Sequence, residues 1–298
     1  MVGDRVIELE CPRQYDLGRT MGQTRRSRGD LNQHSVPGLH WRATRTPLGP
    51  ASFRVGRLDD RLRLDIWGPG AAWIEANAAA LTGLLDKPET FKPDHPLLGP
   101  LARKFVGVHF PRTLRMLEEL VPTIFGQLVT SREAARSFRG LLQEHGDLAP
   151  GPSRLRILPN AETLARLPDY AYAPLGGLAM HARAIRAVAG AASKVETAVE
   201  LPYAEALALL CSIRGIGPWT AAGALGVATG CADAIPLGDL HFPRTVAWAL
   251  AREEEADDAR MLELLAPFAG HRLRALYLIH VGRLGPARRG PRRPMRPI

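Results

Sequence analysis

The stretch that most restricts the fold of this chain is Leu210–Ala221, with the sequence LCSIRGIGPWTA. An apolar, helix-like run ends shortly before two glycines, Gly215 and Gly217, which flank the single apolar residue Ile216. Pro218 suits the first turn of a second helix, because its missing N–H would have no partner there anyway. The pattern predicts two helices joined by a tight turn, with Ile216 filling the gap between them.

A turn of this kind also predicts a ligand. Glycines permit positive φ angles and let the backbone approach another molecule closely. The amides around Gly215, Gly217 and Trp219 would face outward at a helix N-terminus, where the helix dipole favours an anion. A DNA phosphate fits, and such contacts position a duplex without reading its sequence. We expect Ile216 and Thr220 to belong to the same DNA-binding element.

Composition agrees with a soluble globular protein that meets a polyanion. Hydrophobic residues make up 46% of the chain, the formal net charge is +9 and the sequence pI is about 10.1. A basic globular chain has nucleic acid as its first candidate partner. Only four of the basic residues are lysines, an arginine bias that we attribute mainly to GC-rich coding.

The three cysteines, Cys11, Cys211 and Cys231, stand far apart and form no C-x-x-C spacing. This argues against a zinc knuckle, a cysteine-ligated iron–sulfur cluster and a disulfide framework, and fits a reducing compartment. Residues 1–10 are acidic and lack an apolar run, and no apolar stretch reaches bilayer length. We expect a cytoplasmic protein with no membrane partner and no metal held by side chains.

The first 110 residues read as an antiparallel β/α domain. Ser52–Val55 and Arg61–Trp67 alternate charged and apolar residues, the period-two pattern of half-buried strands. Ala71–Leu85 reads as a helix, and the proline-rich stretch 87–100 as a loop.

Residues 111–287 read as an all-helical core, which contains the hairpin 203–229. Ser131 is positioned to cap the second helix of this core. The tail, 288–298, is rich in Arg and Pro and is expected to be disordered. The fold class is therefore α+β. Apolar residues at three- and four-residue spacing predict helices over Leu114–Leu128, Arg132–His145, Ala161–Leu167, Ala179–Ala192, Tyr203–Ile213, Thr220–Thr229, Thr245–Ala251, Ala259–Ala266 and Arg272–Val281.

A carboxylate follows the hairpin. Asp239 lies in a loop marked by Pro236 and Gly238, directly before a predicted helix. Taken alone, an aspartate there is most simply an N-cap. The order of hairpin, glycine- and proline-containing loop, and aspartate at a helix start nevertheless resembles the helix-hairpin-helix DNA glycosylase superfamily.

A third segment supports the resemblance. Ile124–Ala135, IFGQLVTSREAA, is similar to a helix junction of that superfamily, especially in bacterial 3-methyladenine DNA glycosylase II. The segment Pro12–Leu17 looks like the start of the extra β domain of that enzyme. The resemblance implies that Asp239 is the essential catalytic carboxylate. It also implies that Leu128, which follows Gln127, enters the DNA stack where the damaged base has left it.

The implied reaction is release of a damaged, flipped base from duplex DNA by an enzyme without strand-nicking activity. Breaking an N-glycosidic bond builds positive charge on the sugar, which an ionised carboxylate stabilises. Superfamily members that nick the strand carry a lysine where this chain has Trp219, and no lysine follows Lys194. A Schiff base needs an amine, so water is the expected nucleophile. No cofactor is expected, beyond a structural cation on hairpin backbone carbonyls. A bacterial, nucleoid-associated monomer is expected.

The expected base pocket departs from the pattern of alkylpurine enzymes, which line it with aromatic rings that attract cationic bases. Trp219 is present, but Gly223 stands where those relatives carry an aromatic residue. Tyr277 and His280 lie on the helix that supplies another pocket ring, and His241 lies two residues after Asp239. A bulkier or neutral lesion remains an alternative to an alkylated base. A non-enzymatic DNA-binding protein is a second alternative, and a bifunctional lyase a third, disfavoured one.

Overall fold

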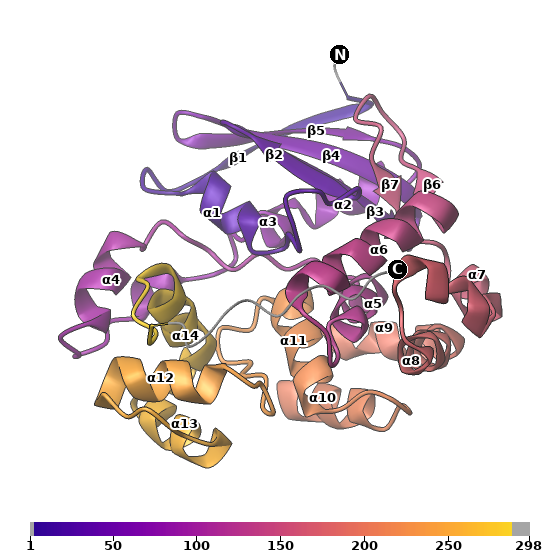
Figure 1. Ribbon diagram of the computed structural model, residues 1–298. Helices are drawn as coiled ribbons and strands as arrows, with labels where there is room; N and C mark the ends of the chain where they lie inside the picture. Colours follow the sequence, from indigo (N-terminus) through magenta and orange to yellow (C-terminus); the bar gives the residue numbers. More distant parts are fainter. Residues whose placement is uncertain (1–2, 288–298) are drawn as a thin grey trace.

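The computed structural model describes residues 3–287, so the predicted disorder of 288–298 falls outside the described residues. A five-stranded antiparallel sheet, in the order β1-β5-β4-β3-β2, covers one side of a helical body (Figure 1). The α+β class is confirmed, and both predicted strands lie in this sheet. Its strands are β1 (Arg5–Glu10), β2 (Gln33–Val36), β3 (Leu39–Thr46), β4 (Gly49–Leu58) and β5 (Arg61–Trp67).

Apolar and charged residues alternate along β4 and β5, which determines which face of the sheet packs against the core. Phe53 of β4 and Leu64 of β5 are fully buried and pack with Ile74 in one apolar cluster. The intervening residues Arg54 and Asp65 are paired across the two strands and form a 2.9 Å ion pair. Period-two side-chain direction thus sends apolar residues to one face and charged residues to the other.

The helix predicted over Ala71–Leu85 is interrupted, which corrects that expectation. Asn77 has φ −109° and ψ 9°, outside the helical region, and its side chain donates to the Trp73 carbonyl. Asparagine offers the backbone such local alternatives to a helix. The helical segments of this part are α1 (Leu17–Gly22), α2 (Ala71–Ala76), α3 (Ala78–Leu81), the 3₁₀ turn η1 (Pro88–Thr90) and α4 (Leu98–Lys104).

The rest of the described chain is mostly helical, and each helix predicted there overlaps an observed one. The helices are α5 (Met116–Phe125), α6 (Ser131–His145), α7 (Ala161–Arg166), α8 (Ala179–Gly190), α9 (Ala192–Glu196), α10 (Tyr203–Cys211), α11 (Pro218–Thr229), α12 (Phe242–Ala251), α13 (Asp258–Leu265) and α14 (Arg272–Val281). This part of the chain also contains a small hairpin of two short strands, β6 (Asp147–Leu148) and β7 (Arg156–Ile157). Its 3₁₀ turns are η2 (Asp169–Ala171), η3 (Ala173–Leu175), η4 (Thr197–Val199) and η5 (Ala266–Phe268).

Two predicted details of the α5–α6 junction are wrong. Helix α5 ends at Phe125 rather than at Leu128, because Leu128 has φ +58°, which a right-handed helix cannot contain. The cap of α6 is Thr130, one residue before Ser131. The Thr130 side chain accepts the Glu133 N–H, and the Glu133 carboxylate accepts the Thr130 N–H at 2.8 Å. This reciprocal capping box begins the helix one position before Ser131 can act as cap.

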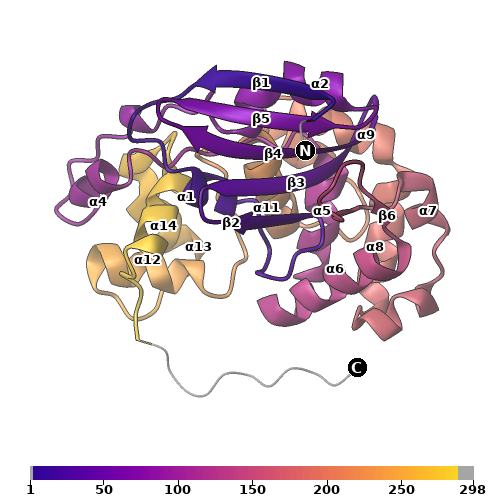
Figure 2. The ribbon, with the colours of Figure 1, turned by 90° about the horizontal axis from the view of Figure 1, so that it is seen from above.

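The helices from α4 onwards form two groups beneath the sheet (Figures 1 and 2), and each group encloses its own apolar cluster. One cluster contains α5, α6, α8, α10 and α11; the other contains α4, α12, α13 and α14. The loop 230–241 runs from α11 in the first cluster to α12 in the second. No helix within 3–287 combines the length and apolar character needed to cross a membrane.

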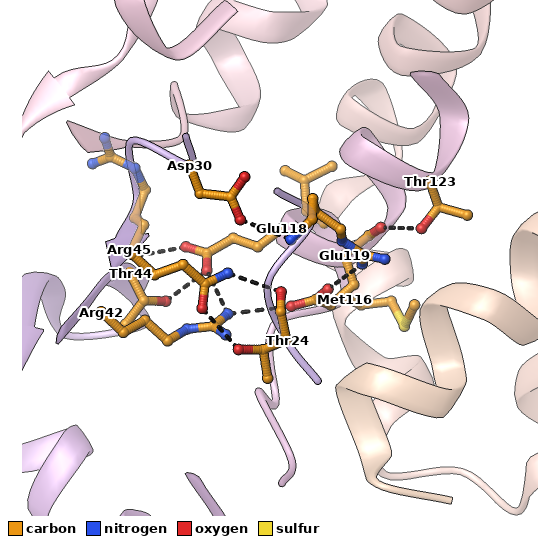
Figure 3. Close-up of polar contacts among 12 residues, drawn as sticks. Thr24, Asp30, Arg42, Thr44, Arg45, Met116, Glu118, Glu119 and Thr123 are labelled. Atoms are coloured by element: carbon orange, nitrogen blue, oxygen red, sulfur yellow. Dashed lines mark hydrogen bonds and ion pairs between the residues drawn. The ribbon is translucent and has the colours of Figure 1, made fainter. Parts of the chain in front are cut away.

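A buried polar cluster holds α5 against the sheet (Figure 3). The Glu118 carboxylate accepts the Thr44 hydroxyl at 2.8 Å, and the neighbouring Glu119 carboxylate pairs with Arg42 at 3.2 Å. All three charged side chains are at most 7% exposed. Removing one partner of such a group leaves an uncompensated buried charge, so the position of α5 depends on the sheet.

Candidate active site

The turn between α10 and α11 has the tight geometry that its sequence predicts. Ile216 is 5% exposed, packs in the helical core, and donates its N–H to the Ile213 carbonyl at 3.0 Å. Gly215 has φ +89°, and a Cβ there would lie 2.8 Å from Cβ of Ala184 on α8. Both the backbone angle and the close approach exclude other residues at Gly215.

Gly217 does not use the positive φ angle that glycine permits. Its φ is −97° and ψ is 175°, an extended conformation open to any residue. A Cβ at Gly217 would meet nothing within 4 Å. Gly217 is the N-cap of α11 and offers no capping side chain. What glycine supplies here is clearance in front of the first-turn amides of α11, where an anion can approach.

Asp239 is held by three N–H donors. Its Oδ1 accepts the backbone N–H groups of His241 at 2.8 Å and Phe242 at 3.0 Å, at the start of α12. Its Oδ2 accepts the indole Nε1–H of Trp219 at 2.9 Å. Asp239 therefore caps α12, as an isolated aspartate there would suggest, and also joins α12 to the hairpin. The carboxylate lies beside the first turn of α11.

Trp219 stands between this carboxylate and the end of α5. A Cβ added to Gly126 would lie 3.1 Å from the ring atom Cη2 of Trp219, so the ring lies directly against that glycine. One turn further along α11, a Cβ on Gly223 would have only Thr123 within 4 Å, at 3.5 Å. Residues four apart share a helix face. At Gly223, α11 therefore has no side chain beside Trp219, and Thr123 of α5 is the neighbour there.

The loop after α5 carries the next two predicted residues. The Gln127 side-chain amide donates to the Gly215 carbonyl at 3.0 Å and to the Thr220 hydroxyl at 2.8 Å. Leu128 is 73% exposed and has φ +58°. Gln127 thus contacts the hairpin directly, while Leu128 projects into solvent from a left-handed backbone conformation that leucine seldom adopts.

The remaining predicted residues are less tightly joined to Asp239. Thr220 is 2% exposed over backbone and side chain together, which corrects its expected contact with DNA; its hydroxyl accepts the Gln127 amide instead. The ring of Tyr277 packs edge-on against that of Phe110, with 5.8 Å between the ring centroids. Burial raises the pKa of the Tyr277 hydroxyl. The side chains of His280 and His241 are exposed. Within residues 3–287, no hydrogen bond or ring contact links Tyr277 or His280 to Asp239 or Trp219.

No group of three or more His, Cys, Asp or Glu side chains in the described part of the chain could hold a metal ion. Among the hairpin carbonyls, that of Gly215 accepts the Gln127 amide and that of Ile213 accepts the Ile216 N–H. A cation on the hairpin carbonyls stays a prediction.

Sequence reasoning missed two residues near this site. His181 of α8 is 1% exposed and its Nε2 lies 2.9 Å from the Gln127 carbonyl oxygen. Leu240 directly follows Asp239 and is 86% exposed. Neither position carried a signal in the sequence, because a histidine in an apolar helix and a leucine in a loop are ordinary. Their importance comes only from what lies beside them.

Comparison with known proteins identifies the fold. No protein-family model and no curated protein matches the sequence. Among solved structures, the chain is similar to a 3-methyladenine DNA glycosylase from Archaeoglobus fulgidus, with 19% identity, TM-score 0.79, and coverage of 93% of this chain and 98% of that one.

Two further structures are similar. The first is the Clostridium acetobutylicum 8-oxoguanine glycosylase/lyase bound to double-stranded DNA, at 13% identity and TM-score 0.73, covering 95% of this chain and 99% of that one. The second is the Schizosaccharomyces pombe 3-methyladenine DNA glycosylase bound to abasic DNA, at 21% identity and TM-score 0.54, covering 66% and 96%. The predicted particular closeness to glycosylase II stays a prediction, and this chain has the fold of the helix-hairpin-helix DNA glycosylases.

Proposed function

We propose that this protein is a monofunctional DNA glycosylase of base excision repair, which hydrolyses the N-glycosidic bond of a flipped, damaged base in duplex DNA. The observation that carries the proposal is the bond between Trp219 Nε1 and Asp239 Oδ2. It sets a carboxylate beside the N-terminal turn of the hairpin helix α11, where a DNA phosphate can bind. A protein that only bound phosphate would have no use for a negative charge there.

The chemistry follows from that placement. The bond between C1′ of the sugar and the base nitrogen breaks, its electron pair leaves with the base, and positive charge grows on the sugar. The Asp239 carboxylate stabilises that charge and orients or deprotonates a water molecule. The water oxygen bonds to C1′ and its proton is released. Leu128 fills the space left in the base stack, whose opening costs a few kcal/mol.

The absence of lyase activity is part of the proposal. Strand nicking through an imine requires an amine at the reacting sugar. Trp219 occupies the hairpin position where the superfamily resemblance places that lysine. Lys194, the last lysine in the sequence, lies 3.5 Å from the Ser212 hydroxyl near the end of α10. One similar structure is named a glycosylase/lyase, so the two activities occur on this fold.

The favoured substrate class is an alkylated base. Trp219 offers a ring on which a cationic base can stack, and two of the similar structures are named 3-methyladenine glycosylases. A specific observation favours a second class: Gly223 has no side chain beside Trp219, and a Cβ there would meet only Thr123, at 3.5 Å. The missing side chain favours a bulkier or neutral lesion. We propose double-stranded DNA as the partner of a cytoplasmic, nucleoid-associated monomer.

A base-release screen tests the proposal. Duplexes that differ only in one central base, carrying methylated, etheno, deaminated or oxidised lesions, are incubated with the protein, and free base is measured by chromatography. We expect release of at least one alkylated base and none from undamaged duplex. Release of no base, with affinity for the same duplexes retained, would instead establish a non-enzymatic DNA-binding protein.

Salt dependence provides an independent test of the DNA partner. Binding through phosphate contacts releases counterions, so the affinity for undamaged duplex should fall steeply between low and physiological salt. The same decline is expected for duplexes of unrelated sequence. A flat salt profile would contradict a phosphate-bound hairpin.

A further inference from the structure

The exposed residue Leu128 is held in an unfavourable backbone conformation. A left-handed conformation costs an L-residue about 1–2 kcal/mol, and it persists only where the surroundings enforce it. Leu128 itself is 73% exposed and so has little packing of its own. The enforcement must therefore come from the residues beside it in the loop.

Gln127 is the neighbour with fixed contacts. Its backbone carbonyl lies 2.9 Å from His181 Nε2, and its side-chain amide donates to Gly215 and Thr220 in the hairpin. One residue thus connects three separate parts of the core: the loop that carries Leu128, helix α8, and the hairpin that carries the phosphate-binding amides.

The tautomer of His181 follows from its contacts. Its Nδ1 accepts the backbone N–H of Leu178 at 3.1 Å, so the ring proton resides on Nε2 and is donated to the Gln127 carbonyl. The ring is 1% exposed and packs edge-on against Phe125, the last residue of α5, at 5.8 Å. Both its position and its donor direction are fixed by packing.

We propose that His181 is a positioning residue for base expulsion. By holding the Gln127 carbonyl, it keeps Leu128 in its projecting conformation and, through the Gln127 side chain, in fixed register with the hairpin. The DNA-binding turn and the inserted leucine then act as one rigid unit. The inference rests on the proposed function, because it assigns His181 a part in opening the base stack.

Rigidity matters most when the target base is still stacked and paired. A preformed wedge avoids the entropy loss of ordering a loose loop during insertion. A base that is already unpaired needs no wedge, since much of the cost of extrusion is absent. Loss of His181 should therefore harm the reaction on a paired lesion much more than on an unpaired one.

The test compares variants on two substrates: one lesion opposite its normal partner, and the same lesion in a single-nucleotide bulge. His181→Phe keeps a ring against Phe125 and removes both hydrogen bonds. We expect its single-turnover rate to fall about tenfold or more on the paired lesion and by less than about threefold on the bulged lesion. His181→Gln retains a donor near the Nε2 position and should restore part of the paired rate. His40→Phe, at another histidine 1% exposed but in β3, is the matched control.

If His181→Phe lowers the single-turnover rate equally on both substrates, His181 is an ordinary core residue. An unchanged rate on the paired lesion would overturn the proposal. A second measurement does not depend on catalysis. Hydrogen exchange of the amides at 126–130 in the free protein should be faster in His181→Phe than in wild type or His40→Phe. If wild type releases no base from any duplex, the proposed function fails, and the exchange data alone decide whether His181 holds this loop.

Discussion

The indole of Trp219 donates a hydrogen bond of 2.9 Å to Oδ2 of Asp239, which joins the hairpin helix α11 to the start of α12. The other carboxylate oxygen caps α12 through two backbone N–H groups. Capping and catalysis can be separated experimentally, because capping needs an acceptor oxygen whereas the proposed catalysis needs a negative charge.

Asp239→Asn should abolish base release while leaving folding and duplex affinity nearly intact. Asparagine is as good an N-cap as aspartate, but it lacks the charge that the sugar cation requires, and its NH2 group, in place of Oδ2, cannot accept the Trp219 N–H. We expect the single-turnover rate to fall about 100-fold or more. The matched control is Asp257→Asn, since Asp257 caps α13 through the Arg260 N–H and takes no part in the proposed site. Wild-type turnover of Asp239→Asn would leave Asp239 as a cap alone.

The two hairpin glycines should respond differently to substitution. Gly215→Ala forces a side chain into a positive φ and against Ala184, so it should lower the free energy of unfolding by about 1–3 kcal/mol. Gly217→Val meets neither obstacle and should change stability by less than about 0.5 kcal/mol. It should nevertheless weaken binding to all duplexes alike, because its side chain occupies the approach to the α11 amides. Urea unfolding measures the stability of both variants, and titration with duplex DNA measures their binding. Strong binding by folded Gly217→Val would show that the phosphate does not bind at the α11 amides.

Leu128→Gly should make the protein more stable and less active. Glycine relieves the left-handed strain, partly offset by its larger unfolded-state entropy, so the free energy of unfolding should rise by about 0.5 kcal/mol. Base release from paired duplex should fall, because nothing fills the opened stack. Leu148→Gly is the control, since Leu148 of β6 is also exposed, is not at positive φ and lies outside the proposed site. A less stable Leu128→Gly protein would show that the loop contacts outweigh the strain.

Strand scission should not accompany base release. An indole cannot form an imine, so the abasic strand should stay intact until alkali treatment, and borohydride should trap no protein–DNA adduct. A bifunctional glycosylase on an oxidised-base duplex serves as the positive control for trapping. An adduct mapped to Lys194, another lysine or the N-terminal amine would overturn the monofunctional proposal and give Asp239 a supporting role.

Stability should decline in acid partly through His40. Burial lowers the pKa of His40 to about 3, with nearby Arg42 contributing in the same direction. Because the folded-state pKa lies below the ordinary value of about 6.5, the contribution is complete above pH 6.5 and is lost as pH falls towards 3. Between these two pKa values, the free energy of unfolding should fall by up to about 1.4 kcal/mol per pH unit because of His40. Urea unfolding between pH 7 and 4 should show a steeper decline for wild type than for His40→Phe; parallel declines would contradict this assignment.

Local sequence determined much of this protein. Glycine and proline placement predicted the hairpin, alternation predicted β4 and β5, and three- and four-residue spacing predicted the helices, because these patterns depend on neighbouring residues. Both hairpin glycines permit positive φ, but only Gly215, which is pressed against α8, adopts it. That distinction depends on Ala184, which is remote in sequence.

The tertiary structure alone decided which groups meet at the site. Asp239 reaches Trp219 across 20 residues, and Gln127 reaches Gly215 and Thr220 across 88 and 93. His181, buried on α8, had no recognisable signal, because a histidine becomes a positioning group only when packing fixes its ring and an acceptor lies opposite. Short-range sequence preferences select helices, strands and turns; long-range packing sets the distances and directions on which the proposed chemistry depends.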